Sequence, residues 1–353
     1  MMKRETWAPK FLLGLCALAS IGLVFAFSNQ AKAEEPEKLL PANSIVYFQY
    51  DGSVKNKKAF EQTAVYESFY KSGFVDVLNN VFTVLIQEAS KASIRSGNHK
   101  GKEKSAQNLK DAKALFATVI KQGASLSVSL PEGQNGPPLP SVTLVVKGVG
   151  KYEPKLRKGL SNLFEQEGVK LKTETIKGRK VSKFVIPDTP GIEAGWWVEG
   201  EHLVIVVGMN ALKKALDVAT GDAPNITTNR LYKKYVLKKV DFSRESIGWI
   251  NLGALRKTFG EFPLPMPSQK NRVKTINDLL TTLGLHNLGA IVSQSGYKGK
   301  STWTETTIEA PGKRTGILKM SAMKTFKLTD LPPLPEKVTS FSVASIDYAN
   351  FYK

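Results

Sequence analysis

A short strand-like motif that occurs twice is the feature that most constrains how this chain can fold. The sequence SIVYFQY at Ser44–Tyr50 matches SIGWINL at Ser246–Leu252 in its serine, isoleucine and aromatic positions. Downstream of each copy, a helical pattern leads into a Gly-Ala pair that opens another strand, at Gly123-Ala124 and at Gly289-Ala290. Self-similarity of this kind indicates a repeated supersecondary unit. We therefore expect two related lobes, with chance similarity between short β-rich strings as the alternative.

A looser third copy lies near the end of the sequence. Ser340–Asp347 repeats the motif, and Leu334-Pro335 before it echoes Leu40-Pro41. The sequence stops at Lys353, where the helix of this copy would begin. We therefore expect the last repeat to be incomplete, as in a truncated form of a longer protein.

The hydrophobic periodicity predicts strands interrupted by helices. Ala124–Leu130 alternates strictly between apolar residues and serines, which is typical of a strand. Apolar residues recur at helical spacing in residues 74–89, 109–120, 156–164, 212–219 and 273–283. Short runs of strand character at Val181–Ile186, Trp196–Val198 and Leu203–Val207 are separated by hairpin-length connections. This order predicts an α+β fold, with largely antiparallel sheets and helices packed on them.

The N-terminus has the layout of a secretory signal peptide. Three cations precede an apolar run at Phe11–Phe27. Ala31-Lys32-Ala33 follows, with small residues at the two positions that signal peptidase recognises. We expect cleavage between Ala33 and Glu34 and export to the periplasm or cell envelope. The alternative is an uncleaved anchor formed by residues 11–27, because the run approaches the roughly 20 residues that span a bilayer.

These features divide the chain into three parts. Residues 1–33 are the predicted signal peptide and residues 34–240 the first α+β lobe. Residues 241–353 are the second α+β lobe, which we expect to be incomplete. The first lobe carries a polar, lysine-rich insert at residues 91–113.

The charge of the chain is strongly positive. It has 50 Lys and Arg against 31 Asp and Glu, a net charge of +19. Signal cleavage removes four of these cations and one anion, which leaves +16 on the mature chain. The field of such a protein attracts polyanions, so we expect an anionic envelope polymer, lipid headgroups or a protein as partner.

The lysine-rich insert is the candidate anion-binding surface. Its cations are Lys91, Arg95, Lys100, Lys102, Lys104, Lys110 and Lys113. The alternative is a solvated loop that only maintains solubility. The insert lacks the interleaved aromatic residues of nucleic-acid modules, so we expect no nucleic-acid partner.

The sequence contains little material for catalysis, and we predict no catalytic, cofactor-binding or metal-binding residue. It has one Cys and three His, and no phosphate-binding or nucleophile-elbow motif. Glu193, Glu199 and Glu201 flank Trp196-Trp197, a combination that suggests sugar binding. We expect instead that the turn carboxylates are solvated and that the two tryptophans divide between a core face and a surface face. His202 is expected to be a solvated or hydrogen-bonded turn residue.

Four segments resemble a family of exported bacterial proteins that carry a domain of unknown function. They are the opening strand L-P-A-[DN]-[ST]-x-x-[YF] at Leu40–Tyr47, the N-x-L-x-x-x-L and A-T-G pattern in Asn210–Gly221, L-G-L-x-x-L at Leu283–Leu288, and A-P-G-x-R-x-G at Ala310–Gly316. The resemblance covers most of the mature chain but rests on turn and core residues. It implies an exported protein and supplies no catalytic residues.

These observations lead to one preferred function and two rivals. We expect a non-catalytic envelope scaffold that binds a protein or polymer outside the cytoplasm. The rivals are an exported hydrolase with an unrecognised site and a signal-anchored accessory subunit of a membrane complex.

Overall fold

The computed structural model describes residues 35–74, 77, 118, 120–130, 139–155, 157, 170–185, 191–264, 273–321, 327, 329 and 331–333. The predicted signal peptide, the lysine-rich insert at residues 91–113 and the third motif copy at Ser340–Asp347 lie outside the described residues. The chain divides into two compact units, residues 1–249 with 292–306 and residues 250–291 with 307–353.

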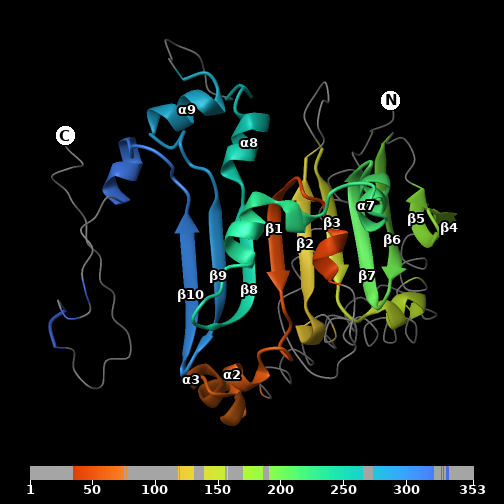
Figure 1. The fold of residues 1–353 in the computed structure, drawn as a ribbon, viewed down its shortest axis with the longest axis horizontal. Coiled ribbons are helices and arrows are strands. Elements are labelled where there is room, and N and C mark those ends of the chain that lie inside the picture. Colours follow the sequence, from red (N-terminus) through yellow and green to blue (C-terminus); the bar gives the residue numbers. More distant parts are fainter. Residues whose placement is uncertain are drawn as a thin grey trace, which may run out of the picture. The chain divides into compact units, whose positions relative to one another are not determined.

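The first unit is built on one antiparallel sheet of ten strands (Figure 1). The α+β class with an antiparallel sheet is therefore confirmed. The strand order is β10-β9-β8-β1-β2-β3-β7-β6-β5-β4. The strands are β1 (Ser44–Tyr50), β2 (Ala124–Ser129), β3 (Ser141–Val146), β4 (Lys170–Ile176), β5 (Arg179–Val185), β6 (Ile192–Glu199), β7 (His202–Met209), β8 (Ser243–Ile250), β9 (Ile291–Lys298) and β10 (Ser301–Ile308).

The two copies of the repeated motif form neighbouring strands in the interior of this sheet. β1 contains the first copy and β8 contains most of the second. The main chains are joined by a hydrogen bond of 2.8 Å from the Asp51 N–H to the Glu245 carbonyl. Beside it, the rings of Tyr47 and Trp249 stack with their centroids 4.2 Å apart. Both side chains are buried, so these matching aromatic positions form part of one core.

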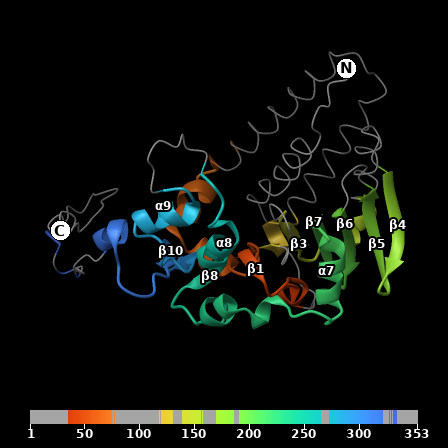
Figure 2. The ribbon, with the colours of Figure 1, turned by 90° about the horizontal axis from the view of Figure 1, so that it is seen from above.

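Both faces of the sheet are covered around β6 and β7. On one face, Trp196 packs with Val146, Val149 and Leu203 in a buried cluster. On the other face lies the helix α7 (Ala211–Ala219), which contacts β3, β6 and β7 (Figure 2). In the strictly alternating strand β2, the serine face is the covered one, because Ser125 and Ser127 are fully buried and the apolar residues are only half-buried.

The described part of the first unit also contains shorter helical elements. They are η1 (Pro36–Leu39), α2 (Lys57–Glu61), α3 (Ala64–Tyr66), η2 (Glu67–Lys71), η4 (Gly150–Tyr152), η5 (Ile226–Thr228) and η6 (Tyr232–Val236). The predicted glycine at the end of the helix before β2 is confirmed. Gly123 has φ +89°, and a Cβ at this position would lie 2.2 Å from the Tyr50 carbonyl oxygen. Only glycine fits this position without strain.

The second unit contains α8 (Leu252–Phe259), α9 (Ile276–Thr282) and η7 (Gly316–Ser321). Asn251 caps α8 by accepting a hydrogen bond from the Ala254 N–H. Thr275 opens α9 with a capping box. The predicted helix around Ile276 and Leu280 is thus confirmed.

Candidate functional site

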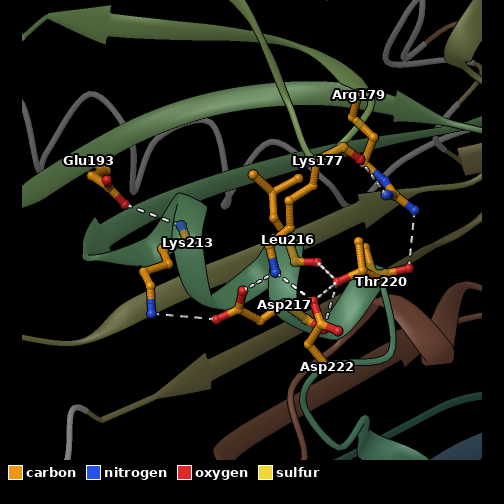
Figure 3. Close-up of polar contacts among 9 residues, drawn as sticks. Lys177, Arg179, Glu193, Lys213, Leu216, Asp217, Thr220 and Asp222 are labelled. Atoms are coloured by element: carbon orange, nitrogen blue, oxygen red, sulfur yellow. Dashed lines mark hydrogen bonds and ion pairs between the residues drawn. The ribbon is translucent and has the colours of Figure 1, made fainter.

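A partly open hollow lies beside α7. It has a volume of about 120 Å³ and lies between the β4–β5 hairpin, β6 and α7 (Figure 3). Its lining consists of Ile176, Lys177, Lys183, Glu193, Leu212, Lys213 and Leu216. Three of these seven side chains carry a positive charge and one carries a negative charge, so the lining itself is basic.

The helix α7 forms one wall of the hollow because its apolar stripe is anchored to the sheet. Leu212, Ala215 and Leu216 are buried against the strands. The N-terminus of α7 is held by the Glu193 carboxylate on β6, which accepts hydrogen bonds from the N–H groups of Leu212 at 2.8 Å and Lys213 at 3.4 Å. The negative charge also complements the helix dipole. Asn210 occupies the N-cap position of this helix, but its side chain makes no capping hydrogen bond.

The opposite wall comes from the tight turn between β4 and β5. Lys177 and Gly178 form a two-residue hairpin connection, and both have positive φ. This turn directs the Lys177 ammonium toward the C-terminal end of α7. There it bonds Asp217 of the helix at 2.5 Å and Asp222, which follows the helix, at 2.6 Å. These hydrogen bonds raise the pKa of Lys177 above its ordinary value. The same contact with Lys177, and a hydrogen bond from Thr220, lower the pKa of Asp222.

The other two lysines of the hollow also have acidic neighbours. Lys213 lies 3.7 Å from Asp217, and Lys183 forms an ion pair with Glu174. The side chain of Lys213 is 79% exposed, and that of Lys183 is one-third exposed. Exposed ion pairs of this type contribute little net stability, because water solvates the separated charges well. These two lysine side chains are therefore held only weakly by their acidic neighbours.

A second polar cluster lies next to the hollow and has a structural role. Arg179 on β5 forms a two-pronged ion pair with Glu199 and donates to the Ala219 carbonyl at the end of α7 at 3.1 Å. The Trp197 indole N–H donates to the same Glu199 carboxylate at 2.8 Å. These contacts connect β5, β6 and α7 through the Arg179 guanidinium.

The structure corrects the interpretation of the tryptophan pair and its carboxylates. Trp196 and Trp197 point to opposite faces of β6, yet each is only 1% exposed. The predicted surface tryptophan was wrong, because α7 covers the face that Trp197 occupies. Glu199 is bonded to Arg179 and Trp197 rather than solvated. A sugar-stacking surface at this position is therefore contradicted.

His202 has an enclosed environment. It opens β7 and is 2% exposed, so the solvated alternative is contradicted. The Gly148 N–H donates to its Nδ1 atom at 3.4 Å. This contact agrees with the expectation of a hydrogen-bonded histidine. It joins the segment after β3 to the start of β7.

The candidate cations of the insert cannot be placed in this site. Lys91, Arg95, Lys100, Lys102, Lys104, Lys110 and Lys113 all lie outside the described residues. Sequence reasoning missed the hollow, because its three lysines are spread over residues 177–213 and meet only through hairpin register and helix packing. The feature of the sequence that could have indicated the hollow is the Lys177-Gly178 pair, which forms the tight turn between β4 and β5.

Among the described residues, no three or more His, Cys, Asp or Glu side chains are grouped so that they could hold a metal ion. None of the helices in this part of the chain has the length and apolar character needed to cross a membrane.

Comparisons with known proteins found no match to this chain among family models, curated proteins or solved structures.

Proposed function

We propose that this protein is an exported, non-catalytic envelope scaffold that binds an anionic polymer or anionic lipid headgroups. The observation that carries the proposal is the lysine-lined hollow, where Lys177, Lys183 and Lys213 surround one surface depression. The net charge of +19 adds a long-range field that raises the encounter rate with polyanions. The lysine-rich insert at residues 91–113 would supply further cations to the same partner.

We also propose that the scaffold consists of two related lobes, residues 34–240 and 241–353. The strand order supports this, because β1 and β8 are neighbours, β2 and β9 flank them, and β3 and β10 follow. The stacked Tyr47 and Trp249 occupy matching positions of the repeated motif. An experimentally determined structure tests the relation. It should allow β1–β3 to be superposed on β8–β10, and strands that cannot be superposed would disprove the repeat.

Export is tested separately by the N-terminus of the protein isolated from the envelope. We expect the mature chain to begin at Glu34, because Ala31 and Ala33 are the small residues that signal peptidase selects. Recovery of an intact Phe11–Phe27 segment in the membrane fraction would support the anchor alternative instead.

Anion binding is tested with dextran sulfate and with vesicles that contain phosphatidylglycerol. We expect binding to weaken steeply between 0.05 and 0.5 M salt, because exposed charges more than about 10 Å apart are screened already at 0.1 M. The triple variant Lys177→Gln, Lys183→Gln, Lys213→Gln should bind about tenfold more weakly, since each exposed contact contributes a factor of roughly two.

A matched control separates a local site from net charge alone. Lys233, Lys238 and Lys239 are exposed and lie away from the lining of the hollow. Their triple change to Gln removes the same charge. The hollow is refuted as a binding site if both triple variants lose the same affinity. Replacing Lys100, Lys102 and Lys104 with Gln tests the insert in the same way. Salt-independent binding would refute the electrostatic proposal as a whole.

A further inference from the structure

A row of exposed apolar side chains runs along α3 and η2. Val65 and Phe69 lie about one helical turn apart, and they are 39% and 44% exposed. Phe74 continues the row, because its ring centroid lies 5.4 Å from that of Phe69 and its side chain is 45% exposed. Large apolar side chains that gather on a surface in this way indicate a site of interaction.

The other side of the same segment is anchored to the sheet. Tyr66 and Tyr70 stack with their ring centroids 5.3 Å apart, and both meet the ring of Phe60 of α2 edge-on. The Phe60 ring in turn lies 5.3 Å from that of Tyr297 on β9. Figure 1 shows α2 and α3 at the end of the sheet where β9 turns into β10. Because these aromatic contacts fix one side of the segment, the apolar row on its other side is held outward.

Exposed lysines border the apolar row and outnumber the acids around it. Among residues 57–74 and 299–300, the lysines are Lys57, Lys58, Lys71 and Lys300, and the acids are Glu61 and Glu67. Lys300 belongs to the turn between β9 and β10, and its carbonyl accepts a hydrogen bond of 2.9 Å from the N–H of Ala64 in α3. Lysine side chains lay their stems along apolar surface while the ammonium groups stay in water. The region therefore combines an apolar row with a positively charged border.

We propose that the α3–η2 segment inserts this apolar row into the headgroup region of an anionic lipid bilayer. The combination of phenylalanine and lysine selects this occupant. A soluble polyanion would engage the lysines but not the phenylalanines, whereas an anionic bilayer surface satisfies both. A second copy of this chain is disfavoured, because each copy carries a large positive charge. The proposal rests on the lipid alternative of the proposed function, and it adds a surface that shares no residue with the hollow beside α7.

Sedimentation of the mature chain with vesicles tests the proposal. We expect binding to vesicles of phosphatidylcholine with phosphatidylglycerol, and little binding to phosphatidylcholine alone. The double variant Phe69→Ser, Phe74→Ser should bind the anionic vesicles less tightly by about tenfold for each phenylalanine, because each ring loses its burial among the lipids. Its binding to dextran sulfate should not change. Lys58→Gln and Lys71→Gln should each weaken vesicle binding about fivefold.

A matched control separates insertion at this segment from a general effect of exposed apolar residues. Leu139 and Leu237 are 43% and 64% exposed and lie outside the α3–η2 segment. Their double change to Ser should leave vesicle binding unchanged. Amide hydrogen exchange locates the contact, since residues 64–71 should exchange more slowly on anionic vesicles than in solution.

Four results would overturn the inference. They are a wild-type protein that does not bind anionic vesicles, a phenylalanine variant that binds them as the wild type does, an equal loss in the leucine control, and exchange at residues 64–71 that vesicles do not slow. The lysine variant of the hollow tests the proposed function separately, because its loss should extend to dextran sulfate. Far-UV circular dichroism shows whether each variant folds. If the double phenylalanine variant does not fold, Phe74→Ser alone should show the tenfold loss.

Discussion

The Glu199 carboxylate offers the sharpest test of how this fold is held together. It accepts hydrogen bonds from Arg179 on β5 and from the Trp197 indole on β6. Trp197 is almost fully buried, and the Glu199 side chain is 16% exposed. Replacing Glu199 with Ala would leave the indole N–H without a partner in a place that water reaches poorly.

The expected cost can be worked from these contacts. A buried donor that loses its acceptor costs about 1–3 kcal/mol. Loss of the Arg179 ion pair, which is partly exposed, adds about 1 kcal/mol. We therefore expect Glu199→Ala to lower the free energy of unfolding by about 3 kcal/mol. Glu199→Gln should cost less, because its amide oxygen can still accept from Trp197.

Urea unfolding followed by tryptophan fluorescence measures these changes, with Glu201→Ala as the matched control. Glu201 lies in the same hairpin turn, and its side chain is exposed. Its replacement should change the free energy of unfolding by less than about 0.5 kcal/mol. If Glu199→Ala and Glu201→Ala unfold at the same urea concentration, the structural role of Glu199 is wrong.

Three further perturbations test other parts of the structure. Trp196→Ala should cost about 3–5 kcal/mol in urea unfolding, because it empties a fully buried site in the core; a cost below 1 kcal/mol would contradict that packing. Gly123→Ala should reduce the melting temperature, because its Cβ would collide with the Tyr50 carbonyl oxygen; an unchanged melting temperature would contradict the close approach. Burial acts to raise the pKa of Asp51, but Lys147 and Lys55 bring it below its usual value. Its stabilisation should thus be complete above about pH 4 and disappear as pH falls through the lowered pKa, so Asp51→Asn should flatten the acid limb of a stability–pH curve.

Much of the local structure could be predicted from periodicity. Ala124–Leu130 alternates with the period of a strand and contains β2, and the stripe at Leu212 and Leu216 forms the buried side of α7. The glycine at Gly123 marked the end of the preceding helix. Such patterns are local, because they depend only on how an element directs its own side chains.

The candidate site could be predicted only in part. The positive charge was evident from composition, and it directed attention to lysines. The hollow itself was not predicted, because Lys177 reaches Asp217 only after a hairpin turn and a helix have packed on the same sheet. Contacts between residues 40 positions apart have no signature in the spacing of either residue.

The sequence alone thus determined the strand β2, the buried stripe of α7, the α+β class and the excess of positive charge. Only the tertiary structure decided which faces are covered. Trp197 and Glu199 look like surface residues in the sequence, yet α7 and Arg179 enclose them. The physical reason is that periodicity sets the direction of a side chain relative to its own strand. Whether that direction leads to solvent or to a core depends on the element that packs above it.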